Sequence, residues 1–161
     1  MIRAAIITAS DKGHKGERED KSAQVIMGMI SEIAQVEHYV VLPDERKVLA
    51  DEMRSLAERG VELILTTGGT GFSPRDVTPE ATRDVIEREV PGIPEAMRAK
   101  SLAITSRAML TRSVAGIVGQ TLIINLPGSP KAVAECLEVV LPALAHGIEI
   151  LTGRGGECAR T

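Results

Sequence analysis

The sequence predicts an α/β protein in which a mostly parallel sheet carries helices on both faces. Short runs of β-branched and aliphatic residues alternate with longer segments in which apolar residues recur every three or four positions. Such alternation is typical of parallel strands joined by right-handed crossover helices. The chain has 161 residues, 43% hydrophobic and 25% charged. We expect one domain at 1–152 and a glycine-rich, flexible C-terminal tail at 153–161, mobile unless a neighbouring subunit holds it.

The first half of the chain shows this alternation most regularly. The run from Ile2 to Ala9 is continuously β-prone, as in a strand buried on both faces. Gly60 stands where a helix would take a left-handed cap before the next strand. The expected elements are a strand at 2–9, a polar loop at 10–17, a helix at 20–34, a strand at 37–42, a helix at 46–59 and a strand at 61–66.

The second half is divided by proline and glycine. Thr78 and Pro79 suit an N-cap and a first helical position, and the Pro91-Gly92 pair should end that helix. A tight turn is expected at Gly119, between two β-prone runs. The expected elements are a helix from 78 to the break at 91, a helix from 94 toward 104, strands at 114–118 and 122–126, and a helix from 129 to 151 with a kink at Pro142.

Composition argues against several classes of function. The net charge of −3 comes from interspersed charges without a basic stripe, and aromatic residues make up only 1%, so nucleic acid is not an expected partner. No apolar run suits a secretory signal or a membrane span, so we expect a cytoplasmic protein with no membrane partner. Cys136 and Cys158 are interpreted as one core thiol and one exposed thiol, with no disulfide or structural metal.

The strongest local motif is Thr67-Gly68-Gly69-Thr70-Gly71, which directly follows the third strand. Glycines at this density cost backbone entropy, which is recovered if the loop needs positive φ angles or lets a ligand approach the backbone. The N–H groups freed in such a turn suit phosphate oxygens. The motif matches neither GxGxxG nor GxxxxGK[ST], so its spacing alone predicts only anion binding. A tight strand exit without a ligand is the alternative.

A second phosphate site is predicted where Leu126, Pro127 and Gly128 lead from a strand into the last helix. The helix N-terminus offers unpaired N–H groups and partial positive charge, to which Ser129 and Lys131 add a hydroxyl and a full charge. Ordinary capping by Ser129 would also explain these residues.

Carboxylates follow the ends of the predicted strands. In an open α/β sheet the ligand lies at the carboxyl ends of the strands, where the loops carrying Ser10, Asp11 and Asp44 should meet the glycine motif. Asp44 and Asp76 could hold Mg²⁺ through water or bind the donor edge of a heterocycle. Alternatively, Asp44 caps the following helix and Asp76 pairs with Arg75.

The run from Leu65 to Thr82 closely resembles the signature of the molybdopterin-binding family, which includes the MogA and MoaB proteins and the G domains of gephyrin-like proteins. Four more segments match the family in the same order, at residues 5–11, 43–45, 91–98 and 125–132, and the match is collinear from about residue 2 to 151. Glu95 and Arg98 lie in the third of these segments, three apart on the predicted helix, where they could equally pair on its surface.

The resemblance implies a three-layer α/β/α domain that transfers AMP from ATP to the terminal phosphate of molybdopterin and releases pyrophosphate. It implies catalytic roles for Asp44 and Asp76, with Mg²⁺ held by Asp76. The residues it assigns to substrate and nucleotide binding are Ser10, Asp11, Thr67, Gly68, Gly69, Thr70, Gly71, Glu95, Arg98, Pro127, Gly128, Ser129 and Lys131. The partners it implies are molybdopterin, ATP, further copies of the chain in a homotrimer or hexamer, and the molybdenum insertase of the same pathway.

Two other functions are compatible with these motifs. A pterin-binding or scaffold paralogue would retain the loops without catalysis, although the pair Asp44 and Asp76 favours an enzyme, because a pure binder needs no carboxylates to hold a metal. A related domain in competence-type proteins acts on nucleotide pyrophosphates, and the absence of a second domain argues against that function.

Overall fold

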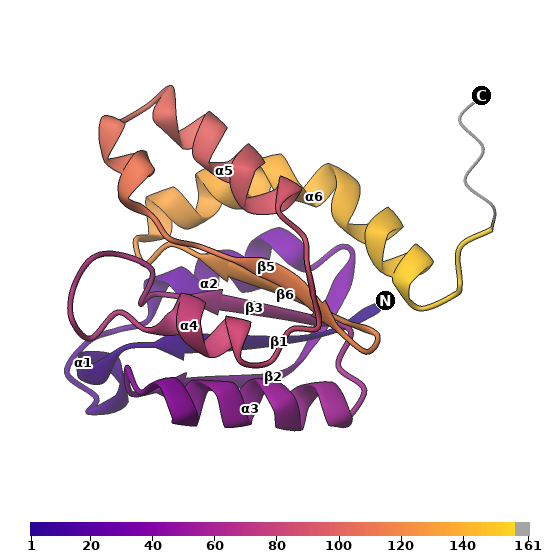
Figure 1. The fold of residues 1–161 in the computed structure, drawn as a ribbon, viewed down its shortest axis with the longest axis horizontal. Coiled ribbons are helices and arrows are strands. Elements are labelled where there is room, and N and C mark those ends of the chain that lie inside the picture. The colour runs from indigo at the N-terminus through magenta and orange to yellow at the C-terminus, as the bar shows by residue number, and fades with distance from the viewer. Residues whose placement is uncertain (157–161) are drawn as a thin grey trace.

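The computed structural model describes residues 1–156 and contains a six-stranded sheet of order β2-β1-β3-β6-β5-β4 between two layers of helices (Figure 1). The strands are β1 (Ile2–Ala9), β2 (Ala34–Leu42), β3 (Leu63–Thr67), β4 (Arg88–Glu89), β5 (Ala115–Val118) and β6 (Thr121–Leu126). The helices are α1 (Asp11–His14), α2 (Lys21–Ile30), α3 (Arg46–Glu58), α4 (Thr78–Arg83), α5 (Gly92–Leu102), the 3-10 helix η1 (Ser106–Leu110) and α6 (Pro130–Leu151). Strands β2, β1, β3 and β6 are parallel, whereas β5 and β4 are antiparallel additions.

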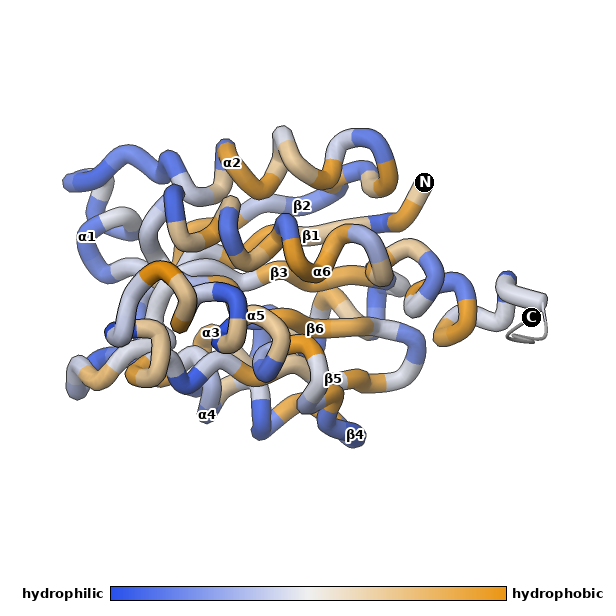
Figure 2. Tube along the Cα trace, turned by 90° about the horizontal axis from the view of Figure 1, so that it is seen from above, coloured by the Kyte–Doolittle hydropathy of each residue, from blue (hydrophilic) through white to orange (hydrophobic). Residues whose placement is uncertain are grey.

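The central strands β1, β3 and β6 are buried on both faces, which confirms the predicted three-layer arrangement. Successive strand residues point to opposite faces, so Ile6 packs in the core beneath α2 and α6, and Ile7 packs in the core beneath α3 and α4. Figure 2 shows the apolar strands running through the middle of the molecule between these layers. Cys136 on α6 is buried, as predicted, while Cys158 lies outside the described residues.

Three predicted elements in the first half have other bounds in the structure, and the first of them is the strand expected at 61–66, which is β3 at Leu63–Thr67. The segment 10–17 is not entirely loop, because Ser10 accepts a hydrogen bond from Gly13 N (2.9 Å) and caps the short helix α1. The helix expected at 20–34 ends at Ile30, and β2 begins at Ala34 instead of residue 37. Ala34 and Val36 fit helical spacing as well as strand alternation, and their pairing with β1 makes this segment a strand.

The second half differs at β4. The helix that begins at Thr78 ends at Arg83 instead of reaching the Pro91-Gly92 break, because the backbone at 87–90 hydrogen-bonds to β5. Residue 77 is the N-cap, without a side-chain cap bond, so the capping role predicted for Thr78 was wrong. Helix α5 begins two residues earlier than expected, at Gly92.

The predicted turns and the last helix agree well with the structure. Gly60 and Gly119 have φ angles of 82° and 53°, as the predicted cap and tight turn require. Helix α6 continues through Pro142, and the kink there stays a prediction. The tail expected to be mobile is held at its start, since Gly153 and Arg154 donate backbone hydrogen bonds to the end of α6 and Arg154 pairs with Glu62 at 2.7 Å. Residues 157–161 lie outside the described part of the chain.

No helix within residues 1–156 is both long and apolar enough to cross a membrane.

A buried amide fixes the carboxyl end of β6. Asn125 is fully buried, its Nδ2 donates to Thr66 Oγ1 (3.0 Å) and Thr82 Oγ1 (2.8 Å), and its Oδ1 accepts from Val114 N (3.1 Å). These bonds join β6 to β3, to α4 and to the residue before β5. The amide therefore ties together the elements that carry the glycine loop and the segment entering α6.

Asn125→Ala is expected to destabilise the fold by about 2 to 3 kcal/mol, because it removes three hydrogen bonds and leaves buried groups unpaired. Urea denaturation should show the loss as a lower midpoint. Ser31→Ala, which removes one exposed bond to Gly28 O, is the control and should change stability by less than about 0.5 kcal/mol. Equal stability of the Asn125 variant and wild type would contradict this role.

Candidate active site

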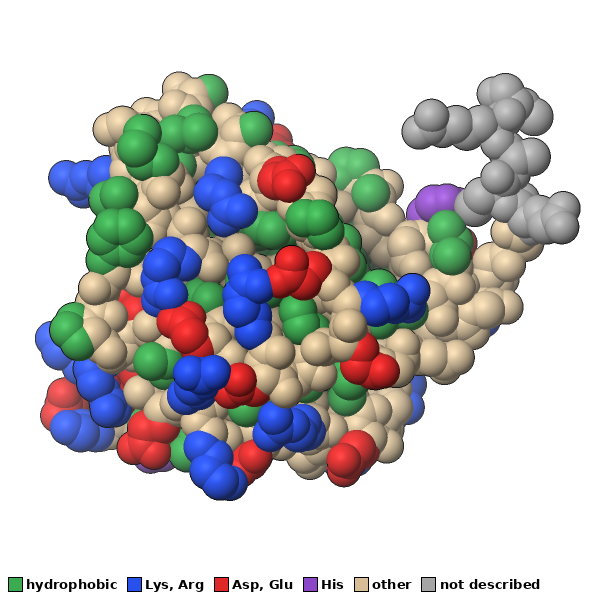
Figure 3. Space-filling model, in the orientation of Figure 1, with side chains coloured by type: hydrophobic (Ala, Val, Ile, Leu, Met, Phe, Trp, Pro, Cys, Tyr) green, Lys and Arg blue, Asp and Glu red, His purple; other side chains and the backbone are tan. Residues whose placement is uncertain are grey.

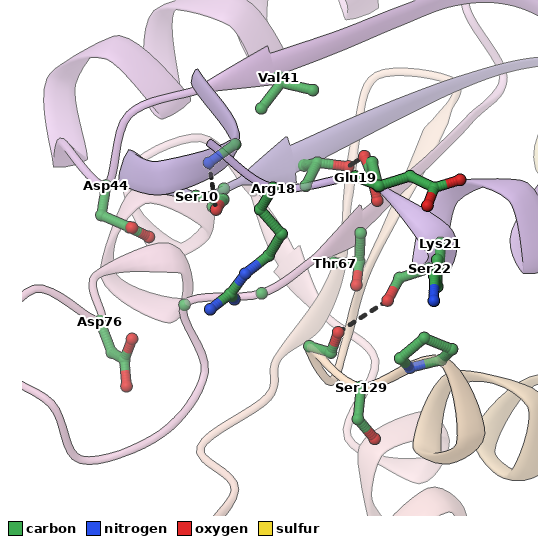
Figure 4. Close-up of a pocket in the computed structure, with 18 residues that line it drawn as sticks. Ser10, Arg18, Glu19, Lys21, Ser22, Val41, Asp44, Thr67, Asp76 and Ser129 are labelled. Atoms are coloured by element: carbon green, nitrogen blue, oxygen red, sulfur yellow. Dashed lines mark hydrogen bonds between the residues drawn. The ribbon is translucent and has the colours of Figure 1, made fainter. Parts of the chain in front are cut away.

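A cleft of about 740 Å³ opens at the carboxyl ends of β1, β2, β3 and β6 (Figure 4). It lies where the strand order reverses, since β1 is followed along the chain by β2 on one side and by β3 on the other. Ligands of open α/β sheets bind at such a switch point. The lining residues are Thr8, Ala9, Ser10, Gly13, Arg18, Glu19, Asp20, Lys21, Ser22, Val41, Asp44, Thr67, Gly68, Gly69, Asp76, Gly128, Ser129 and Pro130.

The glycine loop adopts a backbone that only glycine tolerates well. Gly68 and Gly69 have φ angles of 89° and 69°, in the left-handed region. A Cβ at Gly68 would lie 2.4 Å from Ala9 O, and one at Gly69 would lie 2.3 Å from Thr78 Oγ1. Thr78 Oγ1 in turn donates to Gly68 O at 3.0 Å. The chain therefore makes a tight turn as it leaves β3, and this turn places both glycines on the cleft wall.

Asp11 and Asp44 join the loops after β1 and β2 by hydrogen bonds in both directions. Asp11 N donates to Asp44 Oδ2 and Asp44 N donates to Asp11 Oδ1, each at 3.0 Å. Arg75, in the segment that follows the glycine loop, donates two hydrogen bonds to the Asp11 carboxylate, at 2.9 and 3.0 Å. This bidentate pair and the bond from Asp44 N lower the pKa of Asp11 to about 2. Three loops that are distant in sequence are thus joined at one edge of the cleft.

Asp44 retains one carboxylate oxygen for a ligand. Its Oδ1 is buried and has no hydrogen-bond partner among the described residues. Burial and the nearby negative charges of Asp11 and Asp76 raise the pKa of Asp44. The alternative in which Asp44 caps the following helix was wrong, because Glu45 is the N-cap of α3. A buried acceptor of this kind fits a cation or a donor from a substrate.

Asp44→Asn is expected to raise the thermal midpoint at pH 7 to 8 while it lowers ligand binding. Because the pKa of Asp44 is higher in the folded state than its ordinary value of 3.8, ionisation of this carboxyl destabilises the fold at pH values above the folded pKa. The gain from Asn should shrink as the pH falls toward 3.8. Thermal melts of both proteins between pH 4 and 8 measure this difference, and a gain that grows toward acid pH would contradict it.

Asp76 is held by its own turn. Its Oδ2 accepts from Ser73 N at 3.0 Å, and a Cβ at Gly71 would lie 2.9 Å from the same oxygen. Arg75 pairs with Asp11, so the alternative in which Asp76 merely pairs with Arg75 was wrong. The carboxylate lines the cleft on the side that carries Asp44, as Figure 4 shows.

Two helix N-termini open onto the cleft. Asp20 caps α2 by accepting from Ala23 N (3.0 Å) and also accepts from Thr8 Oγ1 (2.6 Å), which fixes the helix start beside β1. Ser129 caps α6 by accepting from Ala132 N, so the predicted capping is confirmed, and it also lines the cleft. Unpaired N–H groups and the partial positive charge at both helix starts suit phosphate oxygens.

Cationic side chains add to this positive field. Arg18 and Lys21 come from the loop before α2 and from its first turn, and in Figure 4 the Arg18 side chain reaches into the cleft. Ser22 Oγ donates to Gly128 O at 2.7 Å and so joins the start of α2 to the segment entering α6. The cleft therefore has the cations Arg18 and Lys21 and two helix starts, together with Glu19 and Asp20, on one side, and the carboxylates of Asp44 and Asp76 on the other.

Several residues predicted for the site lie elsewhere. Arg98 donates to Ser113 O at 3.2 Å, and it lines a separate depression of about 100 Å³ together with the exposed Glu95. Among the described residues no ion pair joins these two side chains. Lys131 is exposed on the first turn of α6 and does not line the cleft. Four more predicted residues do not line the cleft and are bonded to its neighbours instead, namely Asp11, Thr70, Gly71 and Pro127.

The segment 18–22 was missed by sequence reasoning. Its location just beyond the loop leaving the first strand was the available signal, because loops at the carboxyl ends of parallel strands converge on the ligand. The sequence Arg-Glu-Asp-Lys-Ser is typical of the start of any exposed helix. Its residue spacing therefore does not distinguish a ligand-binding segment from ordinary solvent-exposed surface.

Comparison with known proteins assigns the family. A family model described as “Probable molybdopterin binding domain” matches residues 5–146. The chain belongs to this family. A molybdopterin adenylyltransferase of Helicobacter pylori is 41% identical over 156 residues, covering 94% of this chain and 89% of the relative. Molybdenum cofactor biosynthesis protein B of Staphylococcus carnosus is 36% identical, covering 94% of this chain and 91% of the relative.

Solved structures of the family share the fold. The molybdopterin biosynthesis enzyme MoaB of Thermus thermophilus aligns with a TM-score of 0.90 at 49% identity, covering 95% of this chain and 98% of the other. The likeness spans nearly the whole of both chains, so it includes the strands and loops that build the cleft.

Proposed function

We propose that this chain is a molybdopterin adenylyltransferase of molybdenum cofactor biosynthesis. It transfers AMP from MgATP to the terminal phosphate of molybdopterin and releases pyrophosphate. The observation that carries the proposal is one cleft that joins two helix starts and the cations Arg18 and Lys21 to the carboxylates Asp44 and Asp76 across from them, with Glu19 and Asp20 beside the cations. The full-length similarity to a molybdopterin adenylyltransferase of Helicobacter pylori supports the same activity.

The reaction requires two polyanions to approach each other. A terminal phosphate oxygen of the pterin attacks the α-phosphorus of ATP, a new P–O bond forms, and the bond to the β-phosphate bridging oxygen breaks as pyrophosphate leaves with its electron pair. Positioning and charge neutralisation supply most of the acceleration in such transfers. The starts of α2 and α6, with Arg18 and Lys21, provide positive charge for the phosphates. No covalent enzyme intermediate is needed.

The residues present also fit a magnesium ion carried in with the nucleotide. Asp44 Oδ1 is buried without a partner, and Asp76 lines the same cleft. Within residues 1–156 no group of three or more His, Cys, Asp or Glu side chains forms a metal cage. Mg²⁺ commonly takes one or two carboxylates and completes its shell with substrate phosphates and water. When bound, it would neutralise charge on the leaving pyrophosphate.

Transfer of labelled α-phosphate tests the proposal directly. The protein is incubated with molybdopterin, MgCl₂ and ATP labelled at the α-phosphate. Label is expected on the pterin together with an equal amount of pyrophosphate. Tight pterin binding without label transfer would refute the enzyme.

The second candidate is a non-catalytic molybdopterin-binding or scaffold protein. It is favoured by Asp76, whose Oδ2 already has a structural role in accepting from Ser73 N. It is also favoured by the Staphylococcus carnosus relative, whose name states a place in cofactor biosynthesis and no transfer. Binding of pterin and ATP without pyrophosphate release would select this candidate.

We further propose a cytoplasmic homotrimer or hexamer of the single domain 1–152 that hands its product to the molybdenum insertase. Large apolar side chains are exposed at the end of α5 and on η1, namely Leu102, Ile104, Met109 and Leu110. Figure 3 shows apolar side chains gathered over this end of the molecule, at the upper left. Exposed apolar surface of this kind indicates contact with another protein surface. Light scattering after size-exclusion chromatography gives the subunit number, and a monomer at micromolar concentration would contradict assembly.

A further inference from the structure

Arg112 lies outside the cleft but is bonded to the loop that forms its wall. It stands between η1 and β5, and its backbone N donates to Thr70 O at 2.9 Å. Its Nε donates to Gly71 O and its Nη2 donates to Asp76 O, both at 2.8 Å. Arg112 therefore donates hydrogen bonds to three backbone carbonyl oxygens, two at the start and one at the end of the loop segment 70–76.

These contacts determine where the Asp76 carboxylate sits. The peptide unit is planar and trans, so fixing the carbonyl oxygens of Gly71 and Asp76 fixes the peptide planes that follow them. Gly71 also borders the carboxylate directly, since a Cβ there would lie 2.9 Å from Asp76 Oδ2. A single guanidinium thus fixes the backbone that carries Asp76 and the backbone that contacts its side chain.

Glu80 orients the guanidinium. Arg112 Nη1 donates to both carboxylate oxygens of Glu80, at 2.7 and 2.9 Å, and Glu80 stands in the first turn of α4. The planar guanidinium offers donors in fixed directions, so the bond to Glu80 sets the direction of Nε and Nη2. A lysine ammonium is a point donor and could not reach Glu80, Gly71 O and Asp76 O in this geometry.

We propose that Arg112, oriented by Glu80, is a positioning residue that holds Asp76 and the glycine loop in the geometry needed for AMP transfer. This inference rests on the proposed function for its kinetic consequence, while its structural consequence is independent of that function. Arg112 does not line the cleft, so its effect reaches the substrates through the loop.

The kinetic test compares Arg112→Gln with Arg46→Gln. Arg46 makes a bidentate pair with Asp84 at 2.7 and 2.8 Å and, within residues 1–156, no hydrogen bond to residues 67–76, so it is a matched control. Arg112→Gln is expected to lower kcat on the order of 10²-fold, with KM for ATP changed less than about 3-fold, because small misplacement of reacting groups is that costly. The control should retain wild-type kcat. Unchanged kcat in Arg112→Gln would overturn the proposal.

A double variant distinguishes positioning from general destabilisation. If Arg112 acts through Asp76, adding Arg112→Gln to Asp76→Asn should lower kcat by less than about 3-fold further, since coupled residues are not additive. Fully multiplicative losses would overturn the proposal. Should Arg112→Gln fail to fold, Glu80→Gln replaces it, because it leaves the guanidinium present but removes the carboxylate that orients it.

Amide hydrogen exchange tests the positioning role of Arg112 independently of catalysis. Amides at residues 70–77 of the full chain should exchange at least about 10-fold faster in Arg112→Gln than in wild type, and the control Arg46→Gln should leave them unchanged. Equal exchange in all three proteins would overturn the positioning role. If wild type transfers no AMP yet this exchange difference is present, the proposed function fails and the positioning of Asp76 stands.

Discussion

Asp76→Asn is expected to lower the turnover of AMP transfer at least about 10²-fold while the fold is retained. The fold should survive because an asparagine oxygen can still accept from Ser73 N, as Asp76 Oδ2 does at 3.0 Å. Turnover should fall because the variant loses a negative charge on the cleft wall, which the proposed mechanism uses to hold Mg²⁺. The fold and the turnover should respond differently, because the hydrogen bond from Ser73 N needs only an acceptor oxygen, whereas holding a metal ion needs the negative charge.

Release of pyrophosphate measures this turnover, and thermal melting measures the fold. Asp51→Asn is the matched control, since Asp51 on α3 pairs with Lys47 and Arg54 away from the cleft. It should retain wild-type turnover. Near-normal turnover of purified Asp76→Asn would remove Asp76 from the mechanism.

The sequence predicted those parts of the fold in which local preference and tertiary contacts agree. β1 has the bounds expected from its β-prone run, and the turn at Gly119 lies where glycine was needed. β4 was missed because two exposed residues have no periodicity, and only their pairing with β5 defines them as a strand. Thr78 was misread for a related reason, because its hydroxyl bonds to Gly68 O and not to its own helix.

The site shows the same division. Motifs at strand ends, such as Asp44 and the glycine loop, could be placed because the carboxyl edge of a parallel sheet gathers them. Lys131 was expected in the cleft because its motif enters it, but its position in the first turn of α6 leaves it exposed outside. Arg18 and Lys21 contribute positive charge instead. Which side of a helix start faces a ligand depends on packing between α2 and α6, and a local sequence pattern does not contain this information.

Gly68→Ala is expected to destabilise the protein by more than about 3 kcal/mol and to abolish the cleft geometry. Gly68 has a φ of 89°, and a Cβ there would lie 2.4 Å from Ala9 O, a backbone atom of a buried strand that cannot move aside cheaply. The thermal midpoint should fall by roughly 6 to 12 °C for a chain of this size. Gly28→Ala in α2 is the control, because a Cβ there meets no atom within 4 Å and alanine favours helix.

Gly71→Ala separates the two reasons for glycine in this loop. Gly71 does not have a positive φ, so alanine is compatible with its backbone, but its Cβ would lie 2.9 Å from Asp76 Oδ2 and would displace that carboxylate. Gly71→Ala should therefore keep most of its stability and lose turnover, whereas Gly68→Ala should lose both. Loss of stability alone in both variants would mean that the glycines serve only the strand exit. Loss of turnover without loss of stability at Gly71 would mean that the third glycine is kept for the carboxylate.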